Sequence, residues 1–319
     1  MRAVQVSGDQ HTAKIAVSDS IAKPKPKHTD LLVHVHAAGI TGDELSWPEL
    51  YASPSRIPGH EISGTIAGLG PDYNGTLREG DPVFALLDAT RGEGQAEYVV
   101  CSAQEIARKP NRISHAEASA LPIPLLTAWE ALFDHCNINS SSRVLITGAS
   151  GAVGRVLVQL AVRIIGAQVV ALASARNHEM LRGLGASEVL DYGSLGWGKT
   201  LEGEMDAVFD TAGGEILTKC WLTVKASGCI VTVADPAPAW AFGRGEAVEA
   251  TRLPNVSYKY FIVSPNSEIL NKMADLIDSG MVQALPVEKY PLHEAQGAWD
   301  VARTRGRSSK PVVTMRAED

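Results

Sequence analysis

The sequence reads RVLITGASGAVG from Arg143 to Gly154, and this stretch decides the fold. An apolar run, Val144 to Ile146, enters a turn of small residues at 148–151, and an apolar-rich helical segment from Val153 to Ile165 follows. A strand, a glycine turn and a helix in this order place a helix N-terminus where it can bind a pyrophosphate. The glycines are spaced G-x-x-G-x-x-G. A second apolar run, Gln168 to Ala173, follows at the distance of a β-α-β unit.

Strands and helices alternate through the middle of the chain. The predicted strands span residues 144–147, 168–173, 188–190, 206–210 and 228–233, and the predicted helices span 152–165, 177–184 and 214–224. This alternation predicts an α/β fold with a parallel, doubly wound sheet of the Rossmann type.

Residues 1 to about 120 follow another pattern, with short strands between glycine and proline turns. The predicted strands span 31–37, 61–68, 81–86 and 96–100, and a last strand spans 310–315 after an amphipathic helix at 268–279. Short strands between such turns indicate a small β-barrel. Ser114 opens a helical segment with an acid, Glu117, in its first turn, which makes Ser114 a candidate N-cap.

The composition is that of a soluble globular protein of 319 residues, 45% hydrophobic and 20% charged, with room for two domains. A net charge of -7 argues against a nucleic-acid-binding surface. No apolar run approaches the roughly 20 residues of a membrane helix, and the N-terminus does not resemble a signal peptide. The four cysteines are scattered without a C-x-x-C pair, so we expect neither a disulfide framework nor a clustered zinc site. A reducing cytoplasm fits best.

Short motifs that are weak singly occur in one order along nearly the whole chain. They are Ala37–Ile40, Ile57–Gly64, Glu79–Val83, Ala96–Val99, Leu121–Pro122, Leu126–Trp129, the glycine turn, Leu184–Ala186, Val189–Tyr192 and Phe209–Gly214. In this order they resemble the medium-chain dehydrogenase/reductase family, specifically its zinc-independent quinone oxidoreductase and enoyl reductase branch.

The resemblance implies two domains. A chaperonin-10-like β-barrel domain would comprise residues 1–120 and 266–319, because the chain of the family returns to its first domain at the C-terminus. A Rossmann domain would comprise residues 121–265. The active site of the family lies in the cleft between these domains, which is also where ligands of open α/β sheets are expected.

Zinc-using relatives need three protein ligands around an open fourth position. Their cysteine after the Ala-Gly-Ile turn is replaced here by Thr41, and the segment from Leu86 to Gly94 lacks the cysteines of their structural lobe. His60 is retained from the ligand set, but one histidine is not a site. We therefore predict no bound metal and a structural role for His60.

The phosphorylated cofactor is predicted from the segment that follows the second strand. An acid about 20 residues past the glycine motif selects NAD by accepting the ribose hydroxyls, but Ala173–Asn177 contains no acid. Ser174 can donate a hydrogen bond, and Arg176 a charge-assisted one, to a 2′-phosphate. The resemblance adds Tyr192 as a third contact. These residues predict NADPH, and the alternative is that Arg176 is a solvated arginine at a helix start.

The other cofactor contacts are predicted from the glycine turn and from the resemblance. The turn supplies Ser150, Gly151, Ala152 and Val153, and the segments that lie near the nicotinamide in relatives supply Thr127, Ala234, Phe261 and Val263. Thr127 can equally be an ordinary helix threonine.

Hydride transfer is the chemistry of the cofactor, and the protein must position the substrate and stabilise charge on its oxygen. Without zinc, a C=C bond conjugated to a carbonyl, or a quinone, is easier to reduce than an isolated ketone. We therefore predict a zinc-independent, NADPH-dependent oxidoreductase for a small apolar enone, enoyl or quinone substrate. The alternatives are a ketone or aldehyde reductase and a non-catalytic NADPH-binding scaffold protein.

The catalytic candidates are Thr41, Tyr51 and Thr127. Thr41 stands where relatives carry a cysteine or an asparagine. Tyr51 can donate a proton, although a loop tyrosine can also serve packing alone. Trp47 lies in the same loop without an assigned role, and Glu44 is compatible both with a solvated loop acid and with a site acid.

Two segments late in the chain concern the substrate lid and the dimer contact. The insertion at 236–242 forms either an apolar lid over a bulky substrate or a segment packed on the surface. Relatives dimerise through their last Rossmann strands, and here residues 256–263 would form a long apolar edge that a monomer would have to protect. We therefore expect a homodimer.

Overall fold

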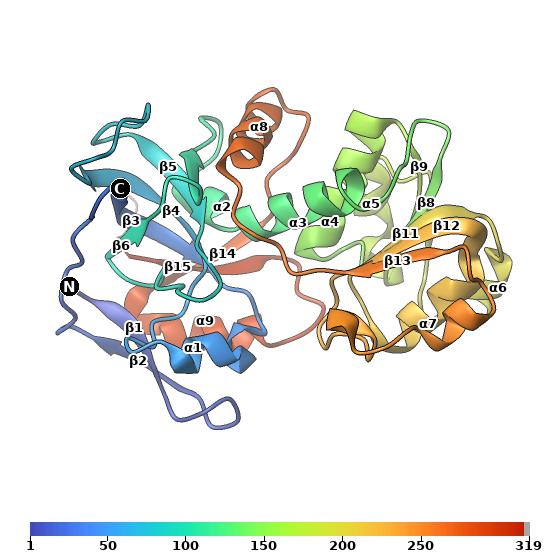
Figure 1. The fold of residues 1–319 in the computed structure, drawn as a ribbon, viewed down its shortest axis with the longest axis horizontal. Helices are drawn as coiled ribbons and strands as arrows, with labels where there is room; N and C mark the ends of the chain where they lie inside the picture. The colour runs from blue at the N-terminus through green and yellow to red at the C-terminus, as the bar shows by residue number, and fades with distance from the viewer. Residues whose placement is uncertain (316–319) are drawn as a thin grey trace. The chain divides into compact units, whose positions relative to one another are not determined.

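The computed structural model describes residues 1–315, and the chain divides into two compact units. The first unit contains Met1–Leu126 and the C-terminal segment from Ser264, and the second contains Thr127–Val263 (Figure 1). The domain boundaries predicted above lie after residues 120 and 265. Each unit has its own sheet and its own buried apolar core.

In the second unit six parallel strands form one sheet in the order β10-β9-β8-β11-β12-β13 (Figure 1). The strands are β8 (Arg143–Thr147), β9 (Gln168–Leu172), β10 (Glu188–Leu190), β11 (Met205–Asp210), β12 (Val224–Thr232) and β13 (Ser257–Tyr260). The strand that comes first in the sequence, β8, lies between β9 and β11. The strand order therefore reverses beside β8, which is where open α/β sheets bind their ligands. The predicted doubly wound sheet is confirmed.

The helices of the second unit connect these strands. They are the C-terminal part of α3 (Pro122–Phe133), α4 (Ala152–Leu160), the π-helical turn η2 (Ala161–Ile165), η3 (Ala175–Asn177), α5 (His178–Leu184), α6 (Trp197–Thr200), α7 (Gly214–Thr223), η4 (Ala241–Gly243) and η5 (Val248–Thr251). Val144, Leu145 and Ile146 of β8 are fully buried. A continuous apolar strand is expected where helices cover both faces of a parallel sheet.

The first unit is built on a mainly antiparallel sheet in the order β14-β15-β3-β4-β5-β7, with β6 paired to β3 and a separate β1–β2 hairpin. The strands are β1 (Ala3–Ser7), β2 (Lys14–Ser18), β3 (Leu31–Gly39), β4 (Glu61–Leu69), β5 (Pro82–Leu86), β6 (Tyr98–Cys101), β7 (Ile106–Arg108), β14 (Val287–Pro291) and β15 (Lys310–Thr314). Because β15 pairs with β3, both ends of the chain build one sheet.

Short helices complete the first unit. They are η1 (Glu44–Ser46), α1 (Pro48–Ala52), α2 (His115–Ser119), the N-terminal part of α3, α8 (Ser267–Asp278), η6 (Leu292–Glu294) and α9 (Ala295–Ala302). Ser114 caps α2, because its hydroxyl accepts from the N–H of Glu117 and the Glu117 carboxylate accepts from the N–H of Ser114. The predicted N-cap is confirmed. Within residues 1–315 no helix is both long and apolar enough to span a membrane.

The last Rossmann strand is shorter and more polar than predicted. β13 comprises only Ser257–Tyr260, with Ser257 and Lys259 exposed. The expectation of a long apolar edge at 256–263 is therefore wrong, since alternate side chains of this edge strand face solvent. Trp240 packs on Tyr258, with 5.0 Å between ring centroids, so part of the 236–242 insertion lies on the surface of β13, as its second interpretation expected.

One cysteine pair also departs from the sequence analysis. Cys136 and Cys229 form a disulfide in the second unit, with their Cα atoms 6.1 Å apart, although 93 residues separate them in sequence. The sequence suggested no disulfide framework and did not predict this single bond, because the sheet brings β12 beside the segment after α3 and no local cysteine spacing signals that contact. Cys101 and Cys220 are free and buried.

Candidate functional site

The glycine turn joins the carboxyl end of β8 to the N-terminus of α4. Gly151 is the N-cap residue, and no side chain caps the first N–H groups of the helix. Gly148 has a φ of +57°, and a Cβ at Gly154 would collide with the carbonyl oxygen of Gly148 and lie 2.6 Å from the Cα of Ala149. Only glycine allows the turn and the helix to approach so closely. The predicted contacts Ser150, Gly151, Ala152 and Val153 thus lie at a helix N-terminus suited to a phosphate group.

Asp210, at the end of β11, ties three neighbouring strand ends together. Its carboxylate accepts hydrogen bonds from the hydroxyls of Thr147 (2.5 Å) on β8 and Thr232 (2.7 Å) on β12, and from the N–H of Gly213 (3.1 Å). The aspartate is 1% exposed, so these donors replace the water that its charge has lost. Asp210 belongs to the Phe209–Gly214 motif named above, but this role was not predicted for it. The signal was a threonine at the end of each neighbouring strand.

The segment predicted to hold the 2′-phosphate follows β9. Ser174 precedes η3, and its hydroxyl accepts from the side-chain amide of Asn177 at 3.0 Å. Arg176 and Tyr192 are both exposed. A carboxylate for which no role was predicted reaches this segment. Asp191 accepts a hydrogen bond from the N–H of Ala175 at 3.0 Å. An acid therefore reaches this segment from the end of β10, although none ends β9.

The residues predicted to lie near the nicotinamide occupy the same unit. Ala234 is buried, and its N–H lies 3.3 Å from the hydroxyl of Thr232 at the end of β12. Phe261 follows β13, is buried, and packs on the ring of His135 with 4.7 Å between centroids. Val263 ends the unit and is half-buried, and Thr127 is buried on α3.

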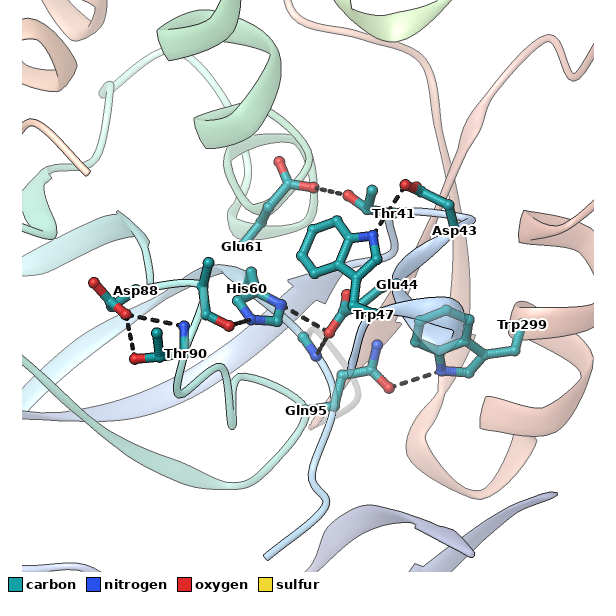
Figure 2. A network of polar contacts seen from close by, with 12 residues as sticks. Thr41, Asp43, Glu44, Trp47, His60, Glu61, Asp88, Thr90, Gln95 and Trp299 are labelled. Atoms are coloured by element: carbon teal, nitrogen blue, oxygen red, sulfur yellow. Dashed lines mark hydrogen bonds and ion pairs between the residues drawn. The ribbon is translucent and has the colours of Figure 1, made fainter. Parts of the chain in front are cut away.

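In the first unit Thr41 belongs to a buried polar network around Glu61 (Figure 2). The Thr41 hydroxyl donates to Oε1 of Glu61 at 3.1 Å, and the N–H of Ile123 donates to Oε2 at 3.0 Å. The ammonium of Lys310, from β15, forms an ion pair with the same carboxylate and donates to the carbonyl of Ala120. Both Glu61 and Lys310 are buried, so each charge depends on the other.

A second buried pair lies beside this network in Figure 2, formed by Glu44 and His60. Oε1 of Glu44 accepts from Nδ1 of His60 at 2.8 Å and from the N–H of Gly59, and Nε2 of His60 faces the carbonyl of Ala89 at 3.2 Å. Trp47 packs on the His60 ring at 5.0 Å between centroids. Glu44 is fully buried, so its interpretation as a solvated loop acid is wrong.

His60 has an acceptor at each ring nitrogen, so both nitrogens donate only when the ring is an imidazolium. Burial by itself lowers the pKa of His60, but the charge and hydrogen bond of Glu44, with the carbonyl of Ala89, outweigh burial and raise the pKa above its ordinary value. The pair is a structural support for the loop that carries Thr41.

Tyr51 takes no part in these two networks. It lies on α1, and its hydroxyl donates to the carbonyl of Leu45 at 2.7 Å. Its ring lines a hollow of about 290 Å³ with Gly8–His11 and Arg56. Burial and the charge of Asp9 raise the pKa of Tyr51, which weakens it as a proton donor.

The positions that hold zinc in zinc-using relatives do not form a metal site here. The hydroxyl of Thr41 is bound to Glu61, and both nitrogens of His60 face other acceptors. Across residues 1–315 no three histidine, cysteine or carboxylate side chains are grouped so that they can hold one ion. This donor set does not fit a catalytic zinc, which needs three protein ligands.

Two family profiles match the chain. The profile described as "Alcohol dehydrogenase GroES-like domain" matches residues 27–111, within the first unit. The profile described as "Zinc-binding dehydrogenase" matches residues 184–313.

Full-length relatives are similar to the chain over most of its length. It is 30% identical over 330 residues to the chloroplastic quinone-oxidoreductase homolog of Spinacia oleracea, covering 94% of each chain. It is 29% identical over 314 residues to the 2-methylene-furan-3-one reductase of Solanum lycopersicum, covering 94% of this chain and 75% of the relative. It is 28% identical over 299 residues to the probable zinc-binding mitochondrial oxidoreductase of Arthroderma benhamiae, covering 89% and 88%.

The fold agrees with these similarities. The structure of the quinone oxidoreductase from Coxiella burnetii superposes with a TM-score of 0.82 at 24% identity, covering 99% of this chain and 100% of the other. The predicted combination of a chaperonin-10-like domain and a Rossmann sheet is thereby confirmed. From the profiles and the full-length relatives, the chain belongs to the medium-chain dehydrogenase/reductase family, in its quinone oxidoreductase and enoyl reductase branch.

Proposed function

We propose that the protein is a zinc-independent, NADPH-dependent oxidoreductase that reduces an activated C=C bond or a quinone. The observation that carries the proposal is the turn before α4, where uncapped N–H groups lie at the carboxyl end of a parallel sheet. Relatives named as a quinone-oxidoreductase homolog and a 2-methylene-furan-3-one reductase support this reaction class.

Two groups of residues in the second unit would hold a nicotinamide dinucleotide, one at its pyrophosphate and one at its nicotinamide. Gly148 and Gly154 let the turn and α4 pack closely, so a pyrophosphate would bind at the start of α4, and Ala234 and Phe261 lie in the segments proposed to hold the nicotinamide. When bound, the reduced nicotinamide supplies the hydride. The residues of this unit bind and orient it.

The proposed choice of NADPH over NADH depends on two opposite charges, Arg176 after β9 and Asp191 after β10. The carboxylate of Asp191 would repel a 2′-phosphate, but its oxygens already accept from the N–H groups of Ala175 and Gly193. The exposed guanidinium of Arg176 offers a charge-assisted hydrogen bond to that phosphate. We favour NADPH because Arg176 brings a positive charge to this segment and the carboxylate of Asp191 already accepts from backbone donors.

Thr41, in the first unit, is the proposed contact of the substrate. The Thr41 hydrogen is committed to Glu61, so Thr41 presents lone pairs and orients a substrate or a water as an acceptor. Lys310 compensates the buried charge of Glu61 and so holds that acceptor in place. The oxygen of an enolate or quinol needs only a modest donor, and its proton comes from solvent or a side chain. This chemistry requires no metal ligand set.

The direct test is hydride transfer from NADPH labelled with deuterium at C4 to a panel of α,β-unsaturated ketones and quinones. We expect stereospecific transfer of deuterium to the substrate and a saturated ketone as the product of an enone. An allylic alcohol would identify a carbonyl reductase instead. Binding of NADPH without transfer to any member of the panel would identify a scaffold protein, and one zinc per chain in metal analysis would contradict zinc independence.

A variant pair tests the role of Thr41. Thr41→Val keeps the shape of the side chain but removes the hydroxyl, and Thr41→Ser keeps the hydroxyl. We expect kcat/KM to fall about tenfold in the valine variant, the effect of one lost hydrogen bond of about 1.4 kcal/mol. The serine variant should retain most of the activity, and equal losses in both would remove the proposed role of the hydroxyl.

A further inference from the structure

The Cys136–Cys229 disulfide joins two distant parts of the second unit. Cys136 follows the end of α3, and Cys229 lies within β12, next to β11, the strand that ends at Asp210. The Cα separation of 6.1 Å lies within the range that a disulfide accepts without backbone movement. The bond therefore connects the segment after a helix to a strand of the parallel sheet that has a neighbour on each side.

The surroundings of this pair accommodate the reduced state as well. Sγ of Cys229 lies 3.3 Å from the carbonyl oxygen of His135. A disulfide sulfur carries no hydrogen, so this contact becomes a hydrogen bond only when Cys229 is a thiol. Reduction thus leaves the Cys229 sulfur with an acceptor already in place.

The two bridged cysteines also differ from the two free ones in exposure. Cys136 is 8% exposed and Cys229 is 9% exposed, whereas Cys101 and Cys220 are completely buried. Burial raises the pKa of the Cys101 and Cys220 thiols far above their ordinary range, which leaves them unreactive. Small oxidants and thiols can therefore react with Cys136 and Cys229 and leave Cys101 and Cys220 unchanged.

We propose that Cys136 and Cys229 form a reversible redox-modification site that is oxidised by peroxides and reduced by dithiols. In the forward step a peroxide oxidises one thiolate to a sulfenic acid and leaves as water, and the other thiolate displaces the second water as the S–S bond forms. Two thiols lose two electrons and two protons, and hydrogen peroxide becomes two waters. In the reverse step a dithiol takes over the disulfide and returns two thiols. Disulfides in a reducing cytoplasm are usually transient and of this kind.

Oxidation or reduction of this disulfide acts on residues of the proposed cofactor site. Its effect on NADPH binding therefore rests on the proposed function. His135, beside Cys136, packs on Phe261 at 4.7 Å between ring centroids. Thr232, three residues after Cys229, binds Asp210 and lies 3.3 Å from the N–H of Ala234. The bond therefore ties the segment of His135, which packs on Phe261, to β12, which leads to Ala234. We expect the oxidised protein to bind NADPH severalfold more tightly than the reduced protein.

The experiment begins with a count of thiols. The purified full chain is treated with hydrogen peroxide or with dithiothreitol, alkylated under denaturing conditions and weighed intact. We expect two alkylated cysteines after peroxide and four after dithiothreitol, with the protected pair mapped to residues 136 and 229. Treatment of the oxidised protein with dithiothreitol before denaturation should restore all four thiols. The urea midpoint of unfolding should be higher after peroxide, because the cross-link closes a loop of 93 residues.

Matched variants assign the effect to this pair. In the double variant Cys136→Ser/Cys229→Ser the urea midpoint and the NADPH dissociation constant should no longer respond to peroxide. The control Cys101→Ala/Cys220→Ala should respond as the unchanged protein does. Four thiols after peroxide, a bond that dithiothreitol cannot reduce in the folded protein, or equal NADPH affinity in both states would overturn the proposal. If NADPH fails to bind either state, the proposed function fails, and the thiol count and urea midpoint still decide the redox site.

Discussion

Single charged residues carry the proposed preference for NADPH. Arg176 and Asp191 carry opposite charges in adjoining segments, and Asp191 enters through a hydrogen bond to Ala175 that sequence spacing did not predict. Charge close to a bound phosphate changes affinity more than most packing contacts do, because charge-assisted hydrogen bonds are about twice as strong as neutral ones. The two side chains can therefore be separated by mutation.

The first prediction concerns these two residues. Arg176→Ala should raise the dissociation constant for NADPH by about tenfold or more, the value of a hydrogen bond to a charged group, and should leave that for NADH nearly unchanged. Asp191→Asn should leave NADPH affinity unchanged or improved and weaken NADH. Titration of protein fluorescence with each cofactor measures both constants. An equal change for the two cofactors in Arg176→Ala would remove the role assigned to Arg176.

The second prediction concerns His60, whose pKa the Glu44 charge raises despite burial. The folded protein binds a proton at His60 over a pH range in which the unfolded chain has lost it. This stabilisation is complete below the ordinary histidine pKa of about 6.5 and is lost as pH rises through the raised pKa. The free energy of unfolding from urea titrations should therefore fall across this range, and His60→Gln, which cannot titrate, should flatten the decline. A decline of equal slope in the variant would assign it to other groups.

At the scale of elements, the β8–turn–α4 unit shows why a glycine pattern predicts a site. The positive φ of Gly148 and the close contact of Gly154 with that turn both exclude a Cβ, so the turn at 148–151 brings the helix close to the end of the strand. Its N–H groups then point to one place with no side chain between them. Gly183, on the exposed surface of α5, has no neighbouring atom within 4 Å of a Cβ and is a natural control.

The third prediction uses this contrast. Gly154→Ala forces backbone apart in a packed turn, so it should destabilise the protein by about 1–3 kcal/mol and weaken both NADPH and NADH binding. Gly183→Ala should be neutral or stabilise by up to about 1 kcal/mol, with no effect on either cofactor. Urea unfolding and fluorescence titration of both variants measure these effects. Unchanged cofactor binding in a folded Gly154→Ala protein would contradict the assignment of the turn.

The elements that were predicted correctly are those whose signal is local. The apolar runs of β8 and β9, the glycine turn and the Ser114 cap each lie within a few consecutive residues, so the sequence reports them directly. The features that were missed depend on residues far apart in sequence. The disulfide joins residues 93 positions apart, and the ends of β9 and β10 bring Asp191 to Ala175. The polarity of β13 was missed because apolar neighbours outside the strand were counted with it.

At the scale of the whole chain, one buried ion pair joins sequence ends that are far apart. Lys310 on β15 and Glu61 on β4 are 249 residues apart, and the sheet places them together at the polar network that holds Thr41. The second unit is inserted between them in sequence. Both the N-terminal segment and the C-terminal strand are therefore needed before the network of the first unit can close.

The fourth prediction follows from this closure. Lys310→Met removes one partner of a buried pair and leaves the Glu61 charge uncompensated, so it should destabilise the protein by about 3–5 kcal/mol. Glu61→Gln should also destabilise it, because the ammonium of Lys310 then lies buried without a countercharge. The double variant Glu61→Gln/Lys310→Met should lose less than the sum of the single variants, since neither charge remains. Urea unfolding of all four proteins measures this double-mutant cycle. If the two single effects simply added, the pair would not be coupled, and Thr41 would have to be held by Glu61 without help from the C-terminal strand.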